Sequence, residues 1–497
     1  MEFIANSINQ LPQQSNCLIV AVFTQNELST IAEELDKASQ GAIRAFLAHG
    51  DLSGKIGETA LLYKVNGINA DRILLVGCGD KKGISDQEFY KLLRSIASNL
   101  KQTKTTQAIY ALTDLNIKEQ NINWQLRQAV IILRDELYSF TQLKSKSESN
   151  AENFKQLDLL TTNDQAAQKA VATGSIIADS VKLAKDLAYL PPNICTPTYL
   201  AEQAQQVAKE IPSLKIEIIE EEQMRELKMG SLLAVTQGSQ QPAKLVILHY
   251  EGANASSNPT ILVGKGITFD TGGINLKPST GILGMKFDMC GAATVLASIR
   301  AAALLKLPLN IIAVMVCVEN MIGSHAYRPD DVVTSMSGQT IEVTNTDAEG
   351  RLILCDALTY CTRFKPEVVI DMATLTGAII TALGKHASGV FSNNQPLADA
   401  LLKAGQESGD RAWQLPIWDE YQSQLDSGVA DMVNSGASGA NSITAACFLS
   451  RFTKEYKWAH LDIAGTAFQL GSKAVATGRP VPLIVQYLID QASSNPH

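Results

Sequence analysis

The chain has 497 residues, of which 45% are hydrophobic and 19% charged, and its formal net charge is −8. These values are typical of a globular protein rather than a disordered one, and the length predicts two domains or more because a single core rarely grows so large. The negative charge argues against an extensive phosphate-binding surface, so a nucleic-acid partner is disfavoured.

The cysteines and the apolar runs limit the function further. Eight cysteines are scattered along the chain without C-x-x-C spacing, so neither a zinc knuckle nor a redox pair is indicated. The N-terminal segment has no basic region followed by an apolar one, and no apolar run reaches the roughly 20 residues that cross a bilayer. We therefore expect no membrane partner and a cytoplasmic location.

The first third of the chain alternates short apolar runs with helical patterns, which predicts an α/β unit with a largely parallel sheet. A hairpin is expected between residues 60–66 and 72–77, across VNGINAD. The GCGD that follows lacks the full G-x-G-x-x-G pattern, so a structural turn is favoured over a nucleotide site. The predicted strands are 17–24, 72–77 and 107–112, and the predicted helices include 27–47 and 85–100.

A change in composition marks the middle of the chain. The polar stretch 143–160 shows no strand pattern and indicates an exposed connection. Apolar residues at helical spacing then predict a long helix over 163–190, which Pro191 and Pro192 end. We expect this helix to link two domains. The predicted division is 1–160 for the N-terminal domain, 161–190 for the linking helix and 191–497 for the C-terminal domain.

The second domain again alternates continuous apolar strands with helices, which predicts a central sheet covered on both faces. Its predicted strands are 215–220, 243–250, 260–267, 310–317, 367–373 and 458–465. Its predicted helices are 291–306, 351–363 and 441–454.

Seven charged side chains stand out between residues 265 and 351, where the flanking segments are apolar or glycine-rich. The carboxylates are Asp270, Asp288, Asp347 and Glu349, and the cations are Lys265, Lys277 and Arg351. Acids brought together in a dry pocket would repel one another and lose hydration, and two divalent cations would neutralise them. The stretch therefore predicts a two-metal hydrolytic site, because paired ions activate a water and stabilise a developing oxyanion.

Local patterns indicate how these residues meet. Asp347, Glu349 and Arg351 are two positions apart, so in extended backbone they share one side. Lys265 interrupts an apolar strand, where a buried lysine can lose its proton and ligate a metal as a neutral amine. The oxygen-rich ligand set suits Mn or Mg, and Zn also accepts carboxylates and amines. Each acid alone would more often be solvated or structural. Only the combination favours a site.

The segment NTDAEGRL at 345–352 resembles the hallmark of the leucyl aminopeptidase family, also called the cytosol aminopeptidases. VGKGITFDTGG, INLKPS, MKFDM, VENM and HLDIAGTAF are similar to family segments in the same order, across roughly residues 175–490. The resemblance implies a metal-dependent exopeptidase that hydrolyses leucine and other residues from the free N-terminus of peptides. It also implies a macro-like N-terminal α/β domain, a larger α/β catalytic domain with a mixed sheet covered by helices, and a homohexamer.

The resemblance also implies individual metal ligands. Asp270 and Glu349 resemble ligands shared by two divalent ions, either Mn or Zn, with Mg as a further option. Lys265 and Asp288 resemble ligands of the exchangeable ion, and Asp347 resembles the ligand of the other.

Two cationic residues resemble the catalytic pair of the family. Lys277 resembles the side chain that polarises the scissile carbonyl, and Arg351 resembles the one that holds a bicarbonate ion as general base. The residues that resemble the substrate pocket are Met285, Asn345, Thr374, Leu375 and Gly377. For Met285, Thr374 and Leu375, packing in the core is the alternative interpretation.

The sequence departs from the family pattern at a few positions. DTGG stands where DSGG is commoner, Cys290 replaces a glycine, and the loop 433–442 lacks an arginine often found there. These departures bear on side-chain preference rather than on the ligands. Two alternative functions remain open at this point: a secondary role in DNA binding or regulation, and a different two-metal hydrolase such as a phosphodiesterase. His325 and His460 are interpreted as structural.

Overall fold

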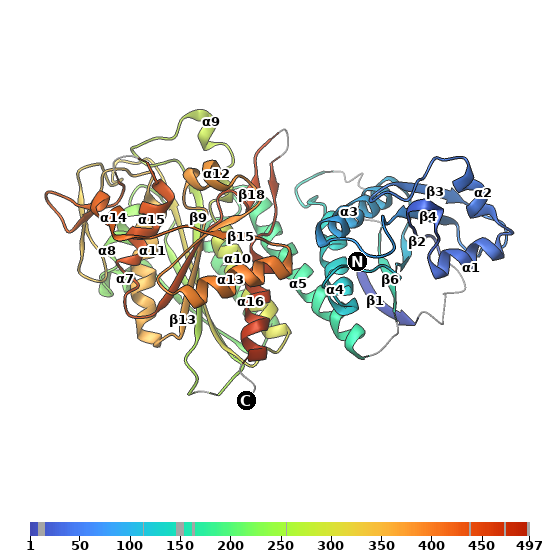
Figure 1. Ribbon diagram of the computed structural model, residues 1–497. Coiled ribbons are helices and arrows are strands. Elements are labelled where there is room, and N and C mark those ends of the chain that lie inside the picture. Colours follow the sequence, from blue (N-terminus) through green and yellow to red (C-terminus); the bar gives the residue numbers. More distant parts are fainter. Residues whose placement is uncertain are drawn as a thin grey trace. The chain divides into compact units, whose positions relative to one another are not determined.

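The computed structural model describes most of the chain (Figure 1). The described residues are 1–7, 15–112, 114–145, 154–161, 165–254, 256–436, 439–471 and 474–494. Contacts divide the chain into two compact units, Met1–Asp179 and Ser180–His497. The division falls inside helix α5 (Gln165–Tyr189), in the stretch for which the sequence predicted a long helix. The predicted domain limits at 160 and 191 stay a prediction.

Unit 1 is built on a six-stranded sheet in the order β1-β6-β5-β2-β4-β3. All neighbouring pairs are parallel except β3 and β4, which form the predicted hairpin. Alternate residues of β2 enter two separate hydrophobic clusters, Ile19 and Ala21 in one and Leu18 and Val20 in the other, so both faces of the sheet are covered. The strands are β1 (Glu2–Ser7), β2 (Leu18–Val22), β3 (Thr59–Tyr63), β4 (Arg72–Gly77), β5 (Gln107–Ala111) and β6 (Gln156–Thr161).

Two predictions for unit 1 were wrong in part. The stretch 143–160 was expected to hold no strand, yet β6 lies at its end, between β1 and β5. Asp158 interrupts its apolar residues and a polar stretch precedes it, but Leu157 and Leu159 enter one core and Leu160 the other. The helix expected over 27–47 is two helices, because the backbone turns at two positive-φ residues, Gln40 and Gly41. The helices are α1 (Thr30–Ala38), α2 (Ala42–Ala48), α3 (Asp86–Gln102) and α4 (Ile122–Glu136), with η1 (Thr24–Asn26).

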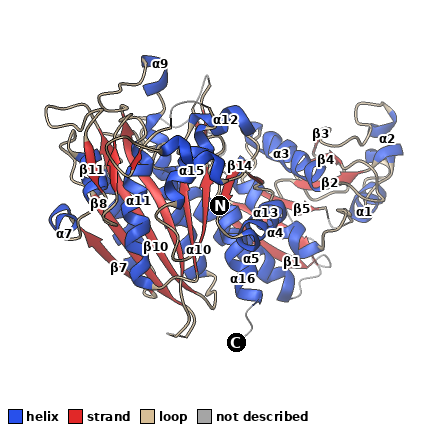
Figure 2. Ribbon diagram, turned by 60° about the vertical axis from the view of Figure 1, so that its left-hand side comes forward, coloured by secondary structure: helices blue, strands red, loops and turns tan. Residues whose placement is uncertain are grey.

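Unit 2 holds an eight-stranded sheet in the order β15-β14-β17-β13-β9-β10-β8-β7. The central strands β17, β13, β9 and β10 are parallel, whereas β8, β7 and β14 run antiparallel to their inner neighbours, so the predicted mixed sheet is confirmed. The red strands of Figure 2 show this sheet with helices packed on it. The strands are β7 (Leu214–Ile219), β8 (Lys244–Glu251), β9 (Thr260–Asp270), β10 (Asn310–Asn320), β13 (Val368–Ala373), β14 (Ser388–Ser392), β15 (Ala412–Gln414) and β17 (Lys457–Asp462).

Two helices pack on opposite faces of β9 and so fix the position of the site. On one face, a Cβ added at Gly264 would lie 2.5 Å from the Gly291 carbonyl oxygen of α10 (Cys290–Leu304). On the other face, Lys265 lies against Gly350 of α11 (Glu349–Cys361), where an added Cβ would be 2.8 Å from the lysine Cε. Glycine at these positions lets each helix approach the strand closely.

The remaining elements complete the two faces and the ends of unit 2. The helices are α6 (Pro197–Glu210), α7 (Glu221–Glu226), α8 (Gly230–Thr236), α9 (Ser279–Ile282), η3 (Met285–Phe287), η4 (Thr362–Phe364), α12 (Gly377–Leu383), α13 (Gln395–Ser408), α14 (Asp419–Gln422), η5 (Ser423–Leu425), α15 (Asn441–Ser450) and α16 (Val481–Ser494). The short strands are β11 (Val332–Thr334), β12 (Thr340–Glu342), β16 (Met432–Val433), β18 (Phe468–Gln469) and β19 (Val475–Ala476).

Among the described residues, one helical stretch, Ser279–Leu304, is long and apolar enough to cross a membrane by length and composition alone. Its most apolar window is 72% buried inside the structure. The stretch is also broken into α9, η3 and α10, and the 15 residues of α10 rise only about 22 Å, short of the ~30 Å hydrocarbon layer. It is the core helix on one face of the sheet.

Candidate metal centre

Strand β9 carries two of the predicted ligands, Lys265 and Asp270, to the end of the sheet. In a regular strand, residues five positions apart would point to opposite faces. The register of the pairing between β9 and β10 shifts between Val318 and Asn320. After this shift, Asn320 lies opposite Asp270. This irregularity changes the direction of the strand end, and the Asp270 charge acts on Lys265.

The turn after Asp270 needs glycine. Gly272 and Gly273 have φ angles of 86° and 68°, in the left-handed region that favours glycine. A Cβ on Gly272 would lie 2.5 Å from the Asn275 carbonyl oxygen and 3.0 Å from Asp347 Oδ1. The sharp turn returns the chain along the site, and Lys277 follows it, with its N–H bonded to the Thr271 carbonyl at 3.0 Å.

The segment from β12 to α11 carries the other predicted residues. Asp347 lies in a turn, whereas Glu349 and Arg351 lie in the first turn of α11. The expectation of extended backbone with all three side chains on one side was therefore wrong. The helix begins two residues earlier than predicted, and its N-terminus is a favourable position for a carboxylate because backbone N–H groups point outward there.

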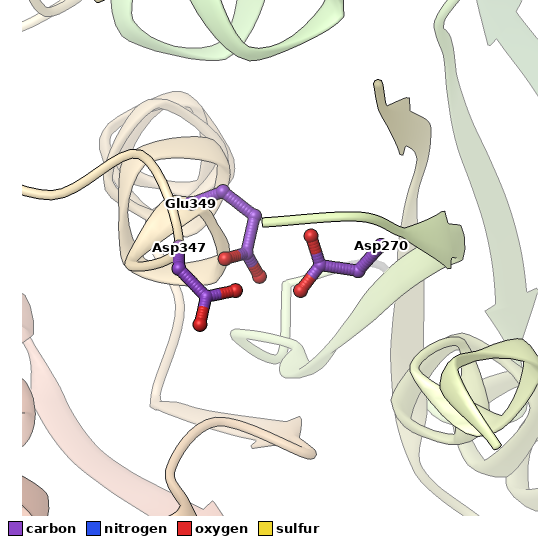
Figure 3. Close-up of side chains that lie close together, drawn as sticks. All are labelled: Asp270, Asp347 and Glu349. Atoms are coloured by element: carbon purple, nitrogen blue, oxygen red, sulfur yellow. The ribbon is translucent and has the colours of Figure 1, made fainter. Parts of the chain in front are cut away.

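The carboxylates of Asp270, Asp347 and Glu349 point toward one another, as Figure 3 shows. One ligand oxygen from each lies within 4.8 Å of the others. Asp270 and Glu349 are each 2% exposed, and Asp347 is partly exposed at the open side of the group. Asp288, between η3 and α10, is also buried and joins the group through Lys265.

Two lysines lie between these carboxylates. Lys265 Nζ contacts Asp288 Oδ2 at 2.9 Å and Glu349 Oε1 at 2.8 Å. Lys277 Nζ contacts Asp270 Oδ2 at 2.9 Å and forms an ion pair with Asp347 Oδ1. The seven residues singled out in the sequence thus include six that share ion pairs in one buried cluster.

The pKa values of the cluster follow from burial and charge. Burial, together with the neighbouring Glu349 and Asp270 carboxylates, raises the pKa of Asp288 despite the opposing charge of Lys265. Burial and Glu349 likewise raise the pKa of Asp347. For Lys265, burial lowers the pKa, but Asp288 and Glu349 outweigh it and the net shift is upward. These carboxylates therefore favour an ammonium group at Lys265, and the role of Lys265 as a neutral amine that ligates a metal stays a prediction.

The donor set fits a cation site. Asp288 Oδ2 and Asp347 Oδ1 are buried, and among the described residues each is bound by one lysine ammonium group and by no other donor. Buried carboxylate oxygens of this kind are costly unless a cation binds them, so the oxygens can also serve a metal ion. Hard divalent ions prefer such oxygen ligands.

Buried polar side chains form hydrogen bonds to the proposed ligands and so fix their orientation. Asn320 Nδ2 donates to Asp270 Oδ1 at 2.7 Å, and Thr374 Oγ1 donates to Asp288 Oδ1 at 2.7 Å. The Thr374 carbonyl also accepts from Lys265 Nζ at 3.0 Å. Sequence reasoning gave no role to Asn320, although its place directly after an apolar run was a signal that it lies at the strand end.

The residues predicted to form the substrate pocket fall in three places. Thr374 and Leu375 follow β13, and Gly377 begins α12 with open space around its Cα. Met285 begins η3 and is partly exposed. Asn345 Oδ1 accepts the Asp347 N–H at 2.9 Å, so it shapes the turn of a ligand. The structure brings Thr374 to the cluster through Asp288, and the binding roles of all five stay a prediction.

One carboxylate outside the predicted set organises the segment after β13. Asp462, at the end of β17, is 1% exposed. Its Oδ1 accepts the Leu375 and Thr376 N–H groups at 3.2 and 3.4 Å, and its Oδ2 accepts the Thr376 hydroxyl at 2.6 Å. His460, two residues earlier, bonds Asp371 through Nδ1 at 2.6 Å and lies in the core, as a structural histidine does.

Comparison with known proteins identifies the protein family of this chain. The catalytic domain of the cytosol aminopeptidase family matches residues 182–485, and the N-terminal domain of that family matches residues 19–147. The chain belongs to the cytosol aminopeptidase family.

Curated relatives agree over the whole length. The chain is 52% identical over 497 residues to a "Probable cytosol aminopeptidase" of Thioalkalivibrio sulfidiphilus, covering 99% of this chain and 100% of the relative. It is 51% identical to a "Cytosol aminopeptidase" of Pseudomonas aeruginosa, with the same coverage. A "Probable cytosol aminopeptidase" of Photorhabdus laumondii is 50% identical, covering 99% of both chains.

These matches confirm several predictions from the sequence. The resemblance to the cytosol aminopeptidases, the two-domain α/β class and the activity of an aminopeptidase, a metal-dependent hydrolase, are all confirmed. The alternative of another two-metal hydrolase is set aside. A secondary role in DNA binding or regulation gains no support from the matched families or relatives.

Proposed function

We propose that the cluster holds two divalent metal ions and uses them to hydrolyse the peptide bond that follows a free N-terminal residue. The observation that carries this proposal is the convergence of Asp270, Asp347 and Glu349, whose ligand oxygens lie within 4.8 Å of one another in a buried group. Asp288 and Lys265 complete the proposed ligand set, with Asp270 and Glu349 shared by both ions. Mn or Zn is the expected metal, with Mg as a weaker option.

When bound, the ions would activate a water molecule, stabilise the developing negative charge and hold the α-amine of the peptide. Lys277 is proposed to polarise the scissile carbonyl. Burial lowers the pKa of Lys277, but Asp270, Glu349 and Asp347 outweigh it and raise the pKa overall, so the side chain stays an ammonium group and a hydrogen-bond donor. Its side chain is 16% exposed, which leaves it accessible from the open side of the cluster.

Arg351 is proposed to hold a bicarbonate ion that acts as general base. The residue is 6% exposed, and burial lowers the pKa of its guanidinium group to about 10, so it remains charged at neutral pH. Its Nη1 donates to the Asn434 carbonyl at 2.9 Å, while its buried Nε has no hydrogen-bond partner among the described residues. A buried donor of this kind suits a small planar anion.

The substrates are proposed to be peptides with a free N-terminus, with leucine among the residues removed. Met285, Asn345, Thr374, Leu375 and Gly377 are the proposed contacts to the substrate. A cytoplasmic location is proposed because the relatives carry the name cytosol aminopeptidase. A homohexamer is proposed only because the family resemblance of the sequence implies one.

The test begins with purified protein that a chelator has freed of metal. After addition of Mn²⁺, Zn²⁺ or Mg²⁺, release of nitroaniline from leucine p-nitroanilide is expected with Mn²⁺ or Zn²⁺, whereas N-acetyl-leucine p-nitroanilide should stay intact. Two bound ions per chain should be found by elemental analysis. Bis(p-nitrophenyl) phosphate serves as the substrate of the alternative hydrolase. Metal-loaded protein that leaves every unblocked aminoacyl substrate intact would contradict the proposal.

A matched pair of variants separates the site from the rest of the chain. Glu349→Gln removes a buried charge of the cluster and should abolish binding of one or both ions together with turnover. Glu367→Gln removes an exposed glutamate that pairs with Lys457 at the other end of the strands. This second variant should bind metal and turn over like the unmodified protein.

A further inference from the structure

Asn434 is a fully buried amide that no predicted role includes. It follows β16 and its exposed fraction is 0%. Its Oδ1 accepts the backbone N–H groups of Thr344 at 2.8 Å and Asn345 at 3.2 Å. Its Nδ2 donates to the carbonyl oxygens of Asn345 at 2.7 Å and Ala348 at 3.4 Å. One side chain thus binds both the N–H groups and the carbonyls of the segment that leads into α11.

The backbone of the same residue contacts Arg351. Its carbonyl accepts Arg351 Nη1 at 2.9 Å, and its N–H donates to the Glu342 carbonyl at 2.9 Å. Strand β16 pairs in parallel with β12, with Met432 opposite Ile341 and Val433 opposite Glu342. The strand pairing therefore fixes the position of Asn434 independently of its side-chain contacts.

Asn434 does not contact the proposed metal ligands directly, but it binds residues that contact or adjoin them. Asn345, which Asn434 holds by both its N–H and its carbonyl, accepts the Asp347 N–H at 2.9 Å through its side chain. Ala348, also held by Asn434, is the residue directly before Glu349 and forms the N-cap of α11. Repulsion among the carboxylates would drive this segment away from Asp270, and the buried amide opposes that movement.

We propose that Asn434 is a positioning residue that holds Asp347, Glu349 and Arg351 in their places before metal binds. The inference rests on the proposed function, because the residue acts toward the same metal centre. An amide that only closed a loop would change the stability of the fold. An amide that prepares the centre also changes the affinity for metal and the rate of turnover.

The main test is Asn434→Ala in the full chain. Metal-free protein is titrated with Mn²⁺, and bound metal is measured by equilibrium dialysis with elemental analysis, which requires no turnover. Loss of a residue that supports metal ligands typically reduces metal affinity 10- to 100-fold, and we expect a loss of about this size. With Mn²⁺ at saturation, kcat for leucine p-nitroanilide should fall by a similar factor, while KM should change less because Asn434 binds only one of the five proposed substrate contacts, Asn345.

Asn310→Ala is the matched control. The Asn310 amide also binds backbone groups on both its ends, the Ala253 N–H at 3.1 Å and the carbonyls of Asn254 and Ser257 at 2.8 and 3.0 Å. It begins β10, about 33 Å along the strand from Asn320 at the site. This variant should lose thermal stability and keep the Mn²⁺ affinity of the unmodified protein.

Thr344→Val removes the hydroxyl contacts to Asn434 Oδ1 at 3.2 Å and to the Ser435 carbonyl at 3.1 Å, and it leaves the backbone contacts in place. It should leave Mn²⁺ affinity and kcat within about twofold. Asn434→Ala with unchanged Mn²⁺ affinity and unchanged kcat would overturn the inference. Unmodified protein that binds no metal or cleaves no aminoacyl substrate would instead overturn the proposed function, so the two failures are distinguishable.

Hydrogen exchange on the unmodified protein supplies a test even where Asn434→Ala does not fold. The N–H groups of Thr344 and Asn345 bond Asn434 Oδ1, so both should be protected in metal-free protein, and addition of Mn²⁺ should change their exchange little. Free exchange of both groups without metal, followed by protection with Mn²⁺, would mean that the ions and not Asn434 order the segment, and would overturn the inference.

Discussion

Replacing Lys277 by methionine tests the electrostatic account of the site. The Lys277 ammonium lies 2.9 Å from Asp270 Oδ2 and pairs with Asp347. Methionine keeps an apolar stem of similar length and removes the charge. Removing one partner of a fully buried ion pair costs about 3–5 kcal/mol. Because the Lys277 and Asp347 side chains are 16% and 31% exposed, solvent lowers the expected cost to about 2–3 kcal/mol.

Metal ions should reverse this loss, because they would supply the missing positive charge to the same oxygens. Thermal unfolding in chelator and in saturating Mn²⁺ measures the difference. A change of 1 kcal/mol shifts the unfolding midpoint of a domain of this size by roughly 2 °C. Lys277→Met should therefore unfold about 4–6 °C below the unmodified protein in chelator and within about 1 °C of it in Mn²⁺.

Turnover gives the second readout of the same variant. If Lys277 polarises the scissile carbonyl, its loss should reduce kcat by about 10²- to 10³-fold, as for other oxyanion donors, with two ions still bound. Full turnover would refute the proposed role in catalysis. A deficit in stability that persists at saturating Mn²⁺ would refute the idea that the ammonium group and the metal ions neutralise the same carboxylates.

Three further changes test other parts of the structure. Thr374→Val removes the hydroxyl that donates to Asp288 at 2.7 Å, and should weaken Mn²⁺ binding to metal-free protein by about 10-fold or more; unchanged affinity would contradict this support. Gly291→Ala places a Cβ against the Met372 carbonyl oxygen of β13 and the Lys265 backbone of β9, and should lower stability by about 1–3 kcal/mol in thermal unfolding, so an unshifted midpoint would contradict the close packing of α10 on these two strands. Burial raises the pKa of Asp356 to about 7, so its contribution to stability is complete below about pH 4 and is lost as pH rises through about 7. Between pH 5 and 8 the unmodified protein should therefore lose stability that Asp356→Asn does not lose, so the unfolding midpoint of the variant should rise relative to that of the unmodified protein. A difference between the two midpoints that does not depend on pH would show that Asp356 does not titrate in this range.

The parts of the fold that the sequence predicted share one physical property. Strands such as β4, β10 and β13 are buried on both faces, so their sequences are continuous apolar runs. Their positions can therefore be predicted from the local sequence, without knowledge of the strands they pair with. Strand β6 was missed because it contains Asp158 and follows a polar stretch. Its place between β1 and β5 is set by long-range pairing, which no local pattern contains.

The same distinction applies to the site. The charged residues were found because charge within apolar sequence is rare, and six of the seven share ion pairs. The arrangement of Asp347, Glu349 and Arg351 was predicted wrongly because α11 begins at Glu349 rather than at Arg351, which replaces an extended segment by a turn and a helix. Asn434 gave no signal at all. Its function depends on the pairing of β16 with β12, more than 80 residues away in sequence.

A cluster of buried carboxylates must be stable enough to fold before any metal arrives, and the two lysines explain how this is achieved. Lys265 lies between Asp288 and Glu349, and Lys277 lies between Asp270 and Asp347, so each ammonium group offsets part of the negative charge of two acids. Burial lowers the pKa of both lysines, but the acids outweigh it and raise the pKa overall, which keeps the ammonium groups charged. A metal ion that binds these oxygens must compete with the ammonium groups. The affinity for metal is thus a difference between two electrostatic states of the same site. Lys277→Met, which removes an ammonium group that is not a proposed ligand, should therefore lower the stability of the metal-free state more than that of the metal-bound state.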